Sequence, residues 1–309
     1  MTCIQKHIPV MLDEVLENLA VQEGGVYVDA TFGNGGYTQA ILQKANCKVI
    51  SVDRDPTVLP RAHELKEKYQ NRFEFKSGCF SELSNLVHEP VDGVVFDIGV
   101  SSMQIDEAER GFSFSKEGRL DMRMSRSGLS AYDIVNSYEK DDLANILYQF
   151  GEEKKSRQIA QKIVDARQEK PIETTTELAE IIYSVLHKKK GQIDPATRTF
   201  QALRIAVNDE LEQLTIGIKA AAELLKPNGR LVVVDFHSLE DRIVKNFFKE
   251  NTPAKTHISR YAENPEIKQK TFSFSSKVIT PTQKEISENP RAHSAKLRFA
   301  IKSKGAQND

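Results

Sequence analysis

The sequence predicts an α/β fold, in which a parallel sheet carries helices on both faces and an all-helical domain interrupts it. Two observations support this fold class. Apolar segments alternate with helical ones over the first hundred residues, and this alternation then stops and later resumes. Segments that are apolar throughout are typical of parallel strands, which are buried on both faces.

The first half of the sheet is predicted from four apolar segments with helical segments between them. The strands are expected at 26–30, 49–53, 73–76 and 94–97, with helices at 38–43 and 58–69. Strands that alternate with helices are typical of βαβ units.

From about 106 to 199 the chain shows almost no strand signal. Helices are expected there at 131–137, 141–150, 154–168 and 177–187. The α/β pattern then resumes with a long helix ending at 225, a turn at 226–229, a strongly apolar strand at 231–236 and further strands at 277–279 and 296–301. We therefore expect one discontinuous domain, 1–105 and 200–309, and a helical insertion, 106–199.

Composition sets limits on the class of protein. The 309 residues carry a net charge of −1. No apolar run approaches the roughly 18 residues that a membrane helix needs, and the first residues lack the layout of a signal peptide. Three cysteines without a CxxC pair favour neither a zinc site nor a disulfide framework. We expect a cytoplasmic protein that has no metal site and no membrane contact, and the oligomeric state stays open, a homodimer included.

A glycine-rich turn follows the first strand and precedes a helix. It contains Gly33, Gly35 and Gly36 and is followed by Tyr37. Glycines allow a tight turn and close approach of a ligand, and open α/β sheets bind ligands at the carboxyl ends of their strands. An ordinary strand–helix turn is the alternative for such a loop taken alone.

Acidic residues follow three of the predicted strands. Asp53 ends the second strand, 24 residues beyond Asp29, and can accept hydrogen bonds from both hydroxyls of an adenosine ribose. Asp97 ends the fourth strand, and Phe80 could cover an adenine ring. The loop lacks the third glycine of the dinucleotide fingerprint. Carboxylates suit the positive charges of S-adenosylmethionine better than they suit a phosphate, which favours methyl transfer over hydride transfer.

Nine sequence blocks resemble one bacterial family, the small-subunit ribosomal RNA cytosine-N4-methyltransferases. The blocks are HIPVMLDE (7–14), DATFGNGG (29–36), DRD (53–55), FDIGVSSMQ (96–104), ERGFSF (109–114), LDMRM (120–124), PATRTFQALRI (195–205), FHSLEDR (236–242) and ENPRA (288–292). The resemblance runs from about residue 7 to about residue 301.

The resemblance implies a class I, Rossmann-like methyltransferase sheet with S-adenosyl-L-methionine as methyl donor. It implies a substrate cytidine in the decoding region of 16S ribosomal RNA within the small ribosomal subunit. By position, the cofactor residues are Gly35, Gly36, Tyr37, Asp53, Phe80, Asp97 and Gln104, and Gly33 lies in the same loop. The family usually has histidine where this chain has Tyr37.

Two residues are candidates for the chemistry at the exocyclic amine. Asp97, or the carbonyls that follow it, is the first candidate to accept hydrogen bonds from N4. His237 is a candidate substrate contact or proton acceptor, because it follows the strongest strand. The alternative for His237 is a structural histidine that caps the next helix.

Arginines and phenylalanines cluster between 110 and 126. We expect Arg110 and Arg123 to contact RNA, since RNA-binding proteins commonly hold phosphates with arginine. The alternative is that the phenylalanines pack the insertion and the arginines pair with Glu109 and Asp121. Arg291 is a further RNA candidate, because residues 241–309 carry a net charge of +7.

Three other functions remain as alternatives. A nucleotide-dependent oxidoreductase could use a similar sheet. A ribosome assembly factor could bind RNA without catalysis. A DNA cytosine-N4 enzyme would usually carry a Pro-Pro-aromatic signature after the fourth strand, where this chain has Ile98 and Gly99.

Overall fold

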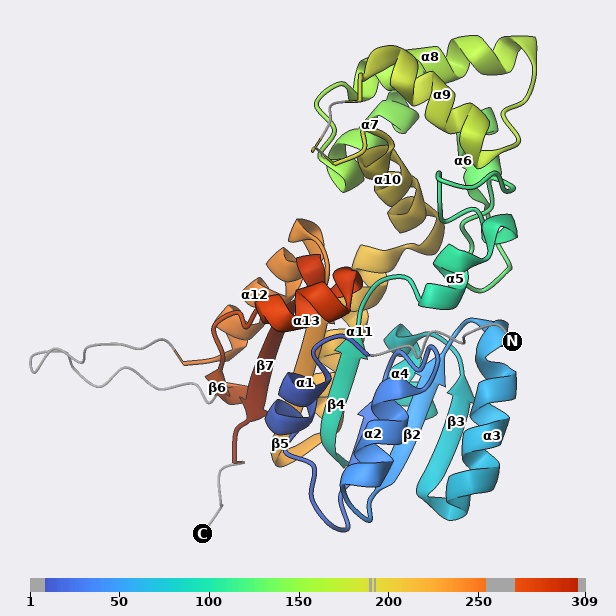
Figure 1. The fold of residues 1–309 in the computed structure, drawn as a ribbon. Helices are drawn as coiled ribbons and strands as arrows, with labels where there is room; N and C mark the ends of the chain where they lie inside the picture. The colour runs from blue at the N-terminus through green and yellow to red at the C-terminus, as the bar shows by residue number, and fades with distance from the viewer. Residues whose placement is uncertain (1–8, 189–190, 192, 254–269, 305–309) are drawn as a thin grey trace, which may run out of the picture. The chain divides into compact units, whose positions relative to one another are not determined.

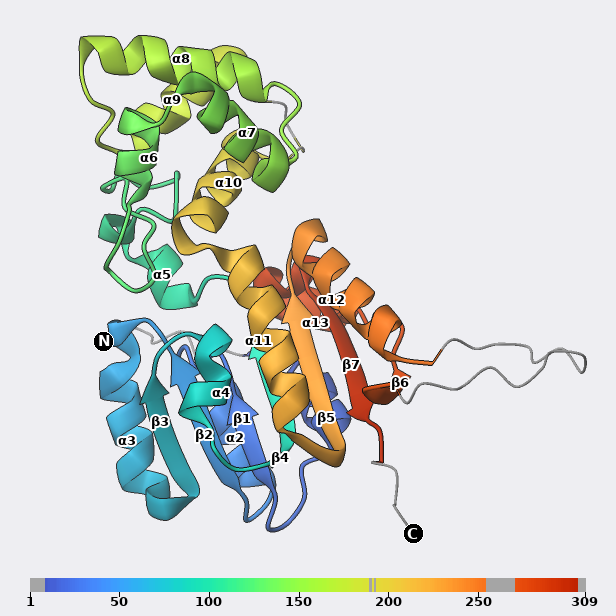
Figure 2. The same cartoon turned by 180° about the vertical axis from the view of Figure 1, so that it is seen from behind.

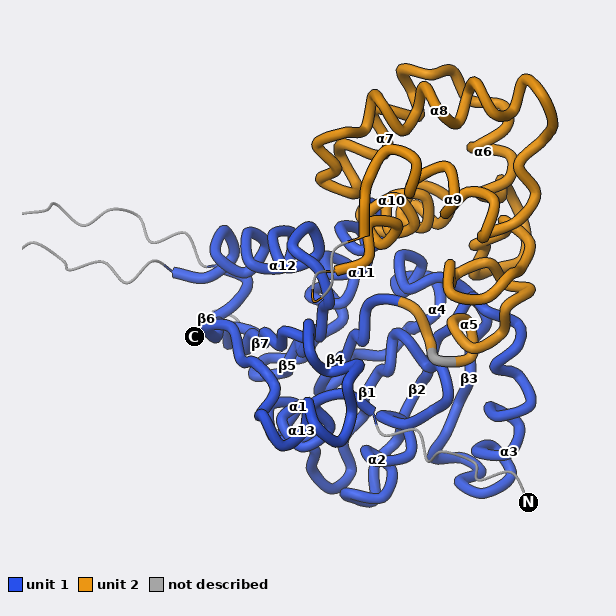
Figure 3. Tube along the Cα trace, turned by 45° about the horizontal axis from the view of Figure 1, so that its top comes forward, with its two compact units in different colours: residues 1–99, 212–309 blue, residues 100–211 orange. Residues whose placement is uncertain are grey.

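The computed structural model describes residues 9–188, 191, 193–253 and 270–304. The parts of the 7–14 block before Pro9, and residues 254–269 of the basic C-terminal region, therefore lie outside the described residues. The chain divides into two compact units, unit 1 with residues 1–99 and 212–309 and unit 2 with residues 100–211 (Figure 3). The expected insertion, 106–199, falls within unit 2. None of the described helices is both long and apolar enough to span a bilayer.

Unit 1 is built on a seven-stranded sheet in the order β3-β2-β1-β4-β5-β7-β6 (Figure 1). Strands β1 to β5 pair in parallel, whereas β7 runs antiparallel to β5 and β6 antiparallel to β7. The strands are β1 (Val26–Asp29), β2 (Lys48–Asp53), β3 (Phe73–Ser77), β4 (Val91–Asp97), β5 (Leu225–Asp235), β6 (Phe272–Ser275) and β7 (Lys296–Lys302). The Rossmann-like fold class predicted from the sequence is confirmed.

Helices cover both faces of this sheet. One face carries α1 (Leu12–Leu19), α2 (Gly36–Lys44) and α3 (Leu59–Tyr69), and the other carries α4 (Leu83–Leu86), α11 (Glu210–Leu224) and α12 (Ser238–Asn251) (Figures 1 and 2). The short helix α13 (Gln283–Glu288) precedes β7. The core under the second face is apolar and fully buried, and Phe96, Leu214 and Val233 belong to it. Burial of this core fixes the strand ends that carry the candidate site.

Two sequence predictions near the C-terminal edge of the sheet need correction. Residues 277–279 form no strand, because Ile279 makes only one isolated bridge, to Leu297. The edge strand is β6, where Phe272 packs edge-on against Phe248, with ring centroids 5.5 Å apart. The turn predicted at 226–229 lies within β5 as a bulge, since the pairing with β4 jumps from Leu225 to Arg230.

Unit 2 is helical, as predicted, with a core of its own. Its helices are α5 (Ser102–Asp106), α6 (Ala131–Ser137), α7 (Lys140–Gly151), α8 (Ser156–Glu169), α9 (Thr175–Val185) and α10 (Ala196–Asn208). Helix α9 begins at a capping box, in which Thr174 and Glu177 exchange hydrogen bonds. Leu143, Ile163 and Leu203 are among the fully buried residues that hold these helices together.

Candidate active site

Three aspartates end neighbouring parallel strands of unit 1. Asp29 is the last residue of β1, Asp53 of β2 and Asp97 of β4. Because β2, β1 and β4 are adjacent and parallel, these residues share the carboxyl edge of the sheet. The sequence pattern predicted this arrangement. A fourth carboxylate, Asp235, ends β5 and is fully buried; the sequence analysis did not single it out.

The three glycines of the loop differ in backbone conformation and in the space around them. Gly33 and Gly35 have positive φ angles of 50° and 71°, which favour glycine. A Cβ at Gly35 would lie 2.8 Å from Leu65 Cδ1, and one at Gly36 would lie 2.4 Å from Pro9 Cγ. A Cβ at Gly33 would meet nothing nearer than a backbone oxygen at 3.9 Å. Packing therefore accounts for Gly35 and Gly36, whereas Gly33 borders open space.

Asp53 holds the glycine loop through hydrogen bonds. Its Oδ2 accepts from the backbone N–H of Gly33 at 2.7 Å, and its Oδ1 accepts from the N–H of Asp55 at 2.8 Å. Burial raises the pKa of Asp53, and the two backbone donors oppose this shift. Each oxygen retains a lone pair, so the carboxylate is held in place and can still accept a hydrogen bond from a ribose hydroxyl.

Asp29 accepts hydrogen bonds from two residues that flank the glycine loop, Thr31 and Thr38. Its Oδ2 accepts from Thr38 Oγ1 at 2.6 Å, and the Thr38 hydroxyl also lies 2.6 Å from Ser51 Oγ. The backbone N–H of Thr31 donates to Oδ1 at 3.3 Å. Burial raises the pKa of Asp29 to about 6. The sequence placed Asp29 at this edge but did not single out Thr38 and Ser51, two polar residues that are fully buried.

Among the three aspartates that end β1, β2 and β4, Asp97 has the fewest hydrogen bonds to its carboxyl group. Its backbone N–H donates to Thr31 Oγ1 at 2.7 Å, which ties the ends of β4 and β1 together. Within the described part of the chain, its buried Oδ1 has no hydrogen-bond partner. Burial, together with the negative charges of Asp29 and Glu240, raises the pKa of Asp97 to about 8. A buried carboxyl oxygen without a donor is a natural place for a bound cation or N–H group.

Phe80 packs on the core next to this edge. Its ring meets Phe96 edge-on, with centroids 5.6 Å apart, and a Cβ at Gly217 would lie 2.7 Å from its Cδ2. The preceding residue, Cys79, donates from Sγ to Gln213 Oε1 at 3.1 Å. Helix α11 therefore fixes the turn that presents Phe80, a contact between distant segments that the sequence does not reveal.

The side chain of Tyr37 is buried and reaches the N-terminal residues of unit 1. The ring is only 3% exposed, and its hydroxyl donates to the backbone carbonyl of Val10. Burial raises the pKa of Tyr37 well above its usual value, so the hydroxyl keeps its proton. The backbone of Tyr37 lies in the first turn of α2.

His237 has the geometry of the structural alternative, since it is the N-cap of α12. Its Nδ1 accepts from the backbone N–H of Glu240 at 3.4 Å, and Glu240 Oε2 accepts in return from His237 N–H at 3.2 Å. Glu240 is fully buried and also accepts from Phe236 N–H at 3.0 Å. This capping box fixes the chain directly after β5. Glu240 was not singled out from the sequence.

Gln104 belongs to unit 2 and is 4% exposed. Its Oε1 accepts from the backbone N–H of Ser101 at 3.0 Å, and Ser101 Oγ accepts from Gln104 N–H at 3.3 Å. These bonds close a capping box at the start of α5. Gln104 therefore has a local structural role within unit 2.

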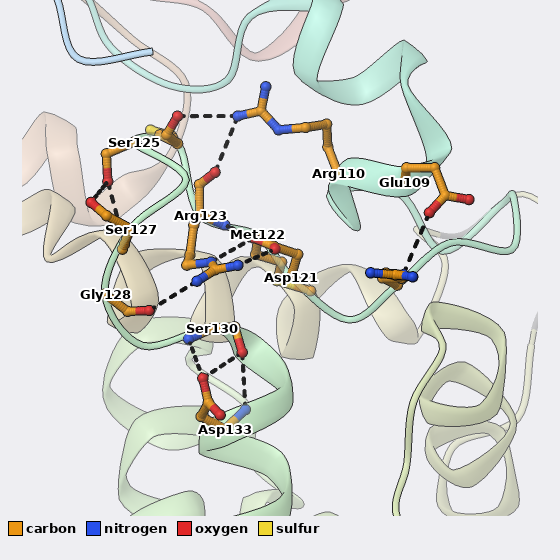
Figure 4. A network of polar contacts seen from close by, with 12 residues as sticks. Glu109, Arg110, Asp121, Met122, Arg123, Ser125, Ser127, Gly128, Ser130 and Asp133 are labelled. Carbon is orange, nitrogen blue, oxygen red and sulfur yellow. Dashed lines mark hydrogen bonds and ion pairs between the residues drawn. The ribbon is translucent and has the colours of Figure 1, made fainter. Parts of the chain in front are cut away.

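Two arginines of unit 2, Arg110 and Arg123, make hydrogen bonds to residues of the loop 121–128 (Figure 4). Arg110 is 5% exposed and donates to the backbone carbonyls of Arg123 and Met124, both at 3.1 Å. Arg123 forms a two-pronged pair with Asp121, with Nε–Oδ1 at 3.0 Å and a terminal nitrogen at 2.7 Å from Oδ2. The predicted pairing with Asp121 is confirmed, and Arg110 supports this loop from inside unit 2.

Other arginines are more accessible. Arg119 is 86% exposed at its side chain and lies 3.9 Å from Glu109, and Arg126 is 53% exposed and lies 3.9 Å from Glu107. Arg291 is exposed on the turn before β7, in unit 1. Phe114 packs edge-on against Phe200 with centroids 5.2 Å apart, inside unit 2.

The sheet order with an antiparallel β7, the glycine turn after β1 and the acidic end of β2 define a Rossmann-like methyltransferase. The model of the MraW methylase family matches residues 4–303. The chain belongs to this family.

Among curated relatives, "Ribosomal RNA small subunit methyltransferase H" of Rickettsia bellii is 49% identical and covers 96% of this chain and 99% of its own length. The protein of the same name from Rickettsia conorii is 49% identical and covers 96% and 98%. Among solved structures, a putative rRNA methylase from Clostridium thermocellum gives a TM-score of 0.44 at 14% identity, covering 96% of this chain and 99% of its own.

Proposed function

We propose that this protein transfers a methyl group from S-adenosyl-L-methionine to the exocyclic N4 of a cytidine in the decoding region of 16S ribosomal RNA. The observation that carries the proposal is the buried Asp97 carboxyl at the end of β4, whose Oδ1 lacks a hydrogen-bond partner within the described residues. It adjoins a glycine turn suited to a nucleoside cofactor. The names of the relatives supply the small-subunit RNA as the substrate class.

The residues present at the strand ends fit this cofactor. Gly33 leaves open space beside the loop, and Asp53 is held with lone pairs available for a ribose hydroxyl. Phe80 is partly buried at the neighbouring turn, where an adenine ring would stack on it. The carboxyls of Asp97 and Asp29 provide negative charge for a sulfonium and an ammonium group. When bound, the cofactor supplies an activated methyl group.

The chemical task of the protein residues is orientation. The cytosine amine is a poor nucleophile because its lone pair is delocalised into the ring. A hydrogen bond from N4 to Asp97 Oδ1 would localise that lone pair and hold the amine in a reactive position. The base must leave its stack to reach such a group. Asp97 is therefore the catalytic residue of the proposal.

His237 has a positioning role in this proposal. Its imidazole and Glu240 fix the turn after β5 through the capping box, and the charge of Glu240 raises the pKa of Asp97. The histidine thereby holds the buried Glu240 at a position where its charge acts on the Asp97 carboxyl. A direct contact between His237 and the substrate stays a prediction.

We assign recognition of the RNA to unit 2 and to Arg291. The exposed Arg119 and Arg126 are available to phosphates, Arg123 is partly exposed, and Arg110 holds their loop in shape. The site of action would be the cytoplasm, where small subunits assemble. A homodimer is the remaining expectation for partners, and sedimentation of the purified protein tests it.

The test is methyl transfer from tritiated S-adenosylmethionine to small ribosomal subunits from cells that lack this gene. We expect label in N4-methylcytidine after nuclease digestion, and none with Asp97→Ala. Binding of subunits without methyl transfer by the wild-type protein would instead support an assembly factor. Binding of NAD in place of S-adenosylmethionine would support an oxidoreductase.

A further inference from the structure

A short N-terminal segment, residues 9–11, lies against the glycine loop. We call it the strap. Pro9 contacts Gly36 so closely that an added Cβ there would lie 2.4 Å from Pro9 Cγ. One residue further along each segment, the Tyr37 hydroxyl donates to the carbonyl of Val10. Two successive residues of the loop are thus in contact with two successive residues of the strap.

Met11, the last residue of the strap, is held by helix α13, which is distant in the sequence. The backbone N–H of Met11 donates to Glu285 Oε1 of α13 at 2.5 Å. Met11 is fully buried and has a φ of 51°, in the left-handed region that a residue with a side chain seldom adopts. Such a conformation persists only where its surroundings hold it. Glu285 therefore fixes the strap at Met11, and Tyr37 fixes it at Val10.

The loop residues under the strap begin helix α2. Gly35 is the N-cap, and no side chain caps the helix there. The first N–H groups of a helix have no partner within the helix, so Gly36 and Tyr37 present backbone donors at the loop. A shift of the strap would move these donors directly, because Pro9 and Val10 contact the two residues that carry them.

We propose that Tyr37 and Glu285 are positioning residues that clamp the strap onto the glycine loop and thereby set the affinity for the nucleoside cofactor. This inference rests on the proposed function. The side chain of Tyr37 acts through its hydroxyl, which is bonded to the carbonyl of Val10 in the strap. Gly36 is a glycine because the strap requires the space that a side chain would fill.

The test uses calorimetric titration with S-adenosylhomocysteine, which reports binding without turnover. We expect Tyr37→Phe to weaken the Kd about tenfold, the effect of losing one buried hydrogen bond of about 1.4 kcal/mol. In methyl transfer, the same variant should raise the KM for S-adenosylmethionine and leave kcat within about twofold. Glu285→Ala, which alters a partly exposed residue outside the loop, should weaken the Kd in the same direction.

The matched control is Tyr69→Phe. Tyr69 is also a buried tyrosine of unit 1, but within the described residues its hydroxyl has no hydrogen-bond partner. The control should leave the Kd unchanged. Because Tyr37 and Glu285 hold the same segment, the double variant should lose less affinity than the two single losses together.

Three outcomes overturn the clamp. The first is an unchanged Kd in Tyr37→Phe with a lowered melting temperature, which would make the hydroxyl structural only. The second is an equal loss in Tyr69→Phe. The third is a Kd that Glu285→Ala leaves unchanged. A wild-type protein that binds neither S-adenosylhomocysteine nor S-adenosylmethionine would overturn the proposed function itself, and the clamp with it.

Discussion

We expect the preference of the protein for a positively charged cofactor over a neutral one to depend on pH. Asp97→Asn should remove this pH dependence. Asparagine keeps the shape of the side chain but cannot ionise. In the wild-type protein the pKa of Asp97 is about 8, raised first by burial and then by Asp29 and Glu240. With that pKa, about 1% of the carboxyl is ionised at pH 6 and about half at pH 8.

A ligand that requires the ionised carboxylate therefore gains up to about 50-fold in affinity between pH 6 and pH 8. S-adenosylmethionine carries a positive sulfonium, whereas S-adenosylhomocysteine shares the rest of the molecule without that charge. The assay is calorimetric titration of both ligands at pH 6, 7 and 8. We expect the Kd of S-adenosylmethionine to fall relative to that of S-adenosylhomocysteine as pH rises. In Asp97→Asn the ratio of the two Kd values should not change with pH.

The same substitution has a consequence for stability. The pKa of Asp97 is higher in the folded than in the unfolded protein, so folding takes up a proton between about pH 4 and pH 8. This contribution to stability is present below pH 4 and is lost as pH rises through 8, by at most about 1.4 kcal/mol per pH unit. Asp97→Asn should flatten the fall. The reasoning would be refuted if the ratio of the two Kd values in the wild-type protein did not change with pH. It would also be refuted if the stability of Asp97→Asn fell with pH as steeply as that of the wild-type protein.

Three further substitutions test the supporting structure. Thr38→Val removes the hydroxyl that donates to Asp29 and should lower the free energy of unfolding by about 1–3 kcal/mol in urea titrations. Gly36→Ala should cost about 1–3 kcal/mol through its clash with the strap and should weaken cofactor binding. Arg119→Ala should weaken rRNA binding and reduce the slope of log K against log salt concentration by about one, with an unchanged melting temperature. Arg110→Ala should instead lower the melting temperature.

Each of these has a control or an outcome that contradicts it. Gly24→Ala is the control for cofactor binding: with a φ of 71° it strains the backbone of a turn, but an added Cβ there has nothing within 4 Å. An equal loss of cofactor binding in Gly24→Ala would count against the strap. Unchanged stability in Thr38→Val would show that Asp29 does not depend on this hydroxyl. Equal melting temperatures for Arg119→Ala and Arg110→Ala would contradict the assigned supporting role of Arg110.

The central strands were predictable because burial on both faces makes them apolar throughout. The edge was not: Ser273 and Ser275 weaken the signal of β6, and its pairing depends on Phe272 packing on α12. The long helix expected to end at 225 is two helices, because Asp209, with a φ of 52°, separates α10 from α11.

For the site, strand ends in the sequence placed Asp29, Asp53 and Asp97 at one edge. The sequence could not show that Asp53 holds Gly33 or that Tyr37 bonds to Val10, because those contacts depend on how distant segments pack. For His237, the sequence allowed two interpretations, and the geometry of the capping box supports the structural one.

The most direct test of the central claim is mass mapping of 16S ribosomal RNA from cells with this gene, without it, and with its Asp97→Ala form. The account predicts one methyl group on N4 of a decoding-region cytidine with the intact gene and its absence in the other two. Undiminished methylation of that cytidine in the Asp97→Ala cells, or in cells without the gene, would contradict it.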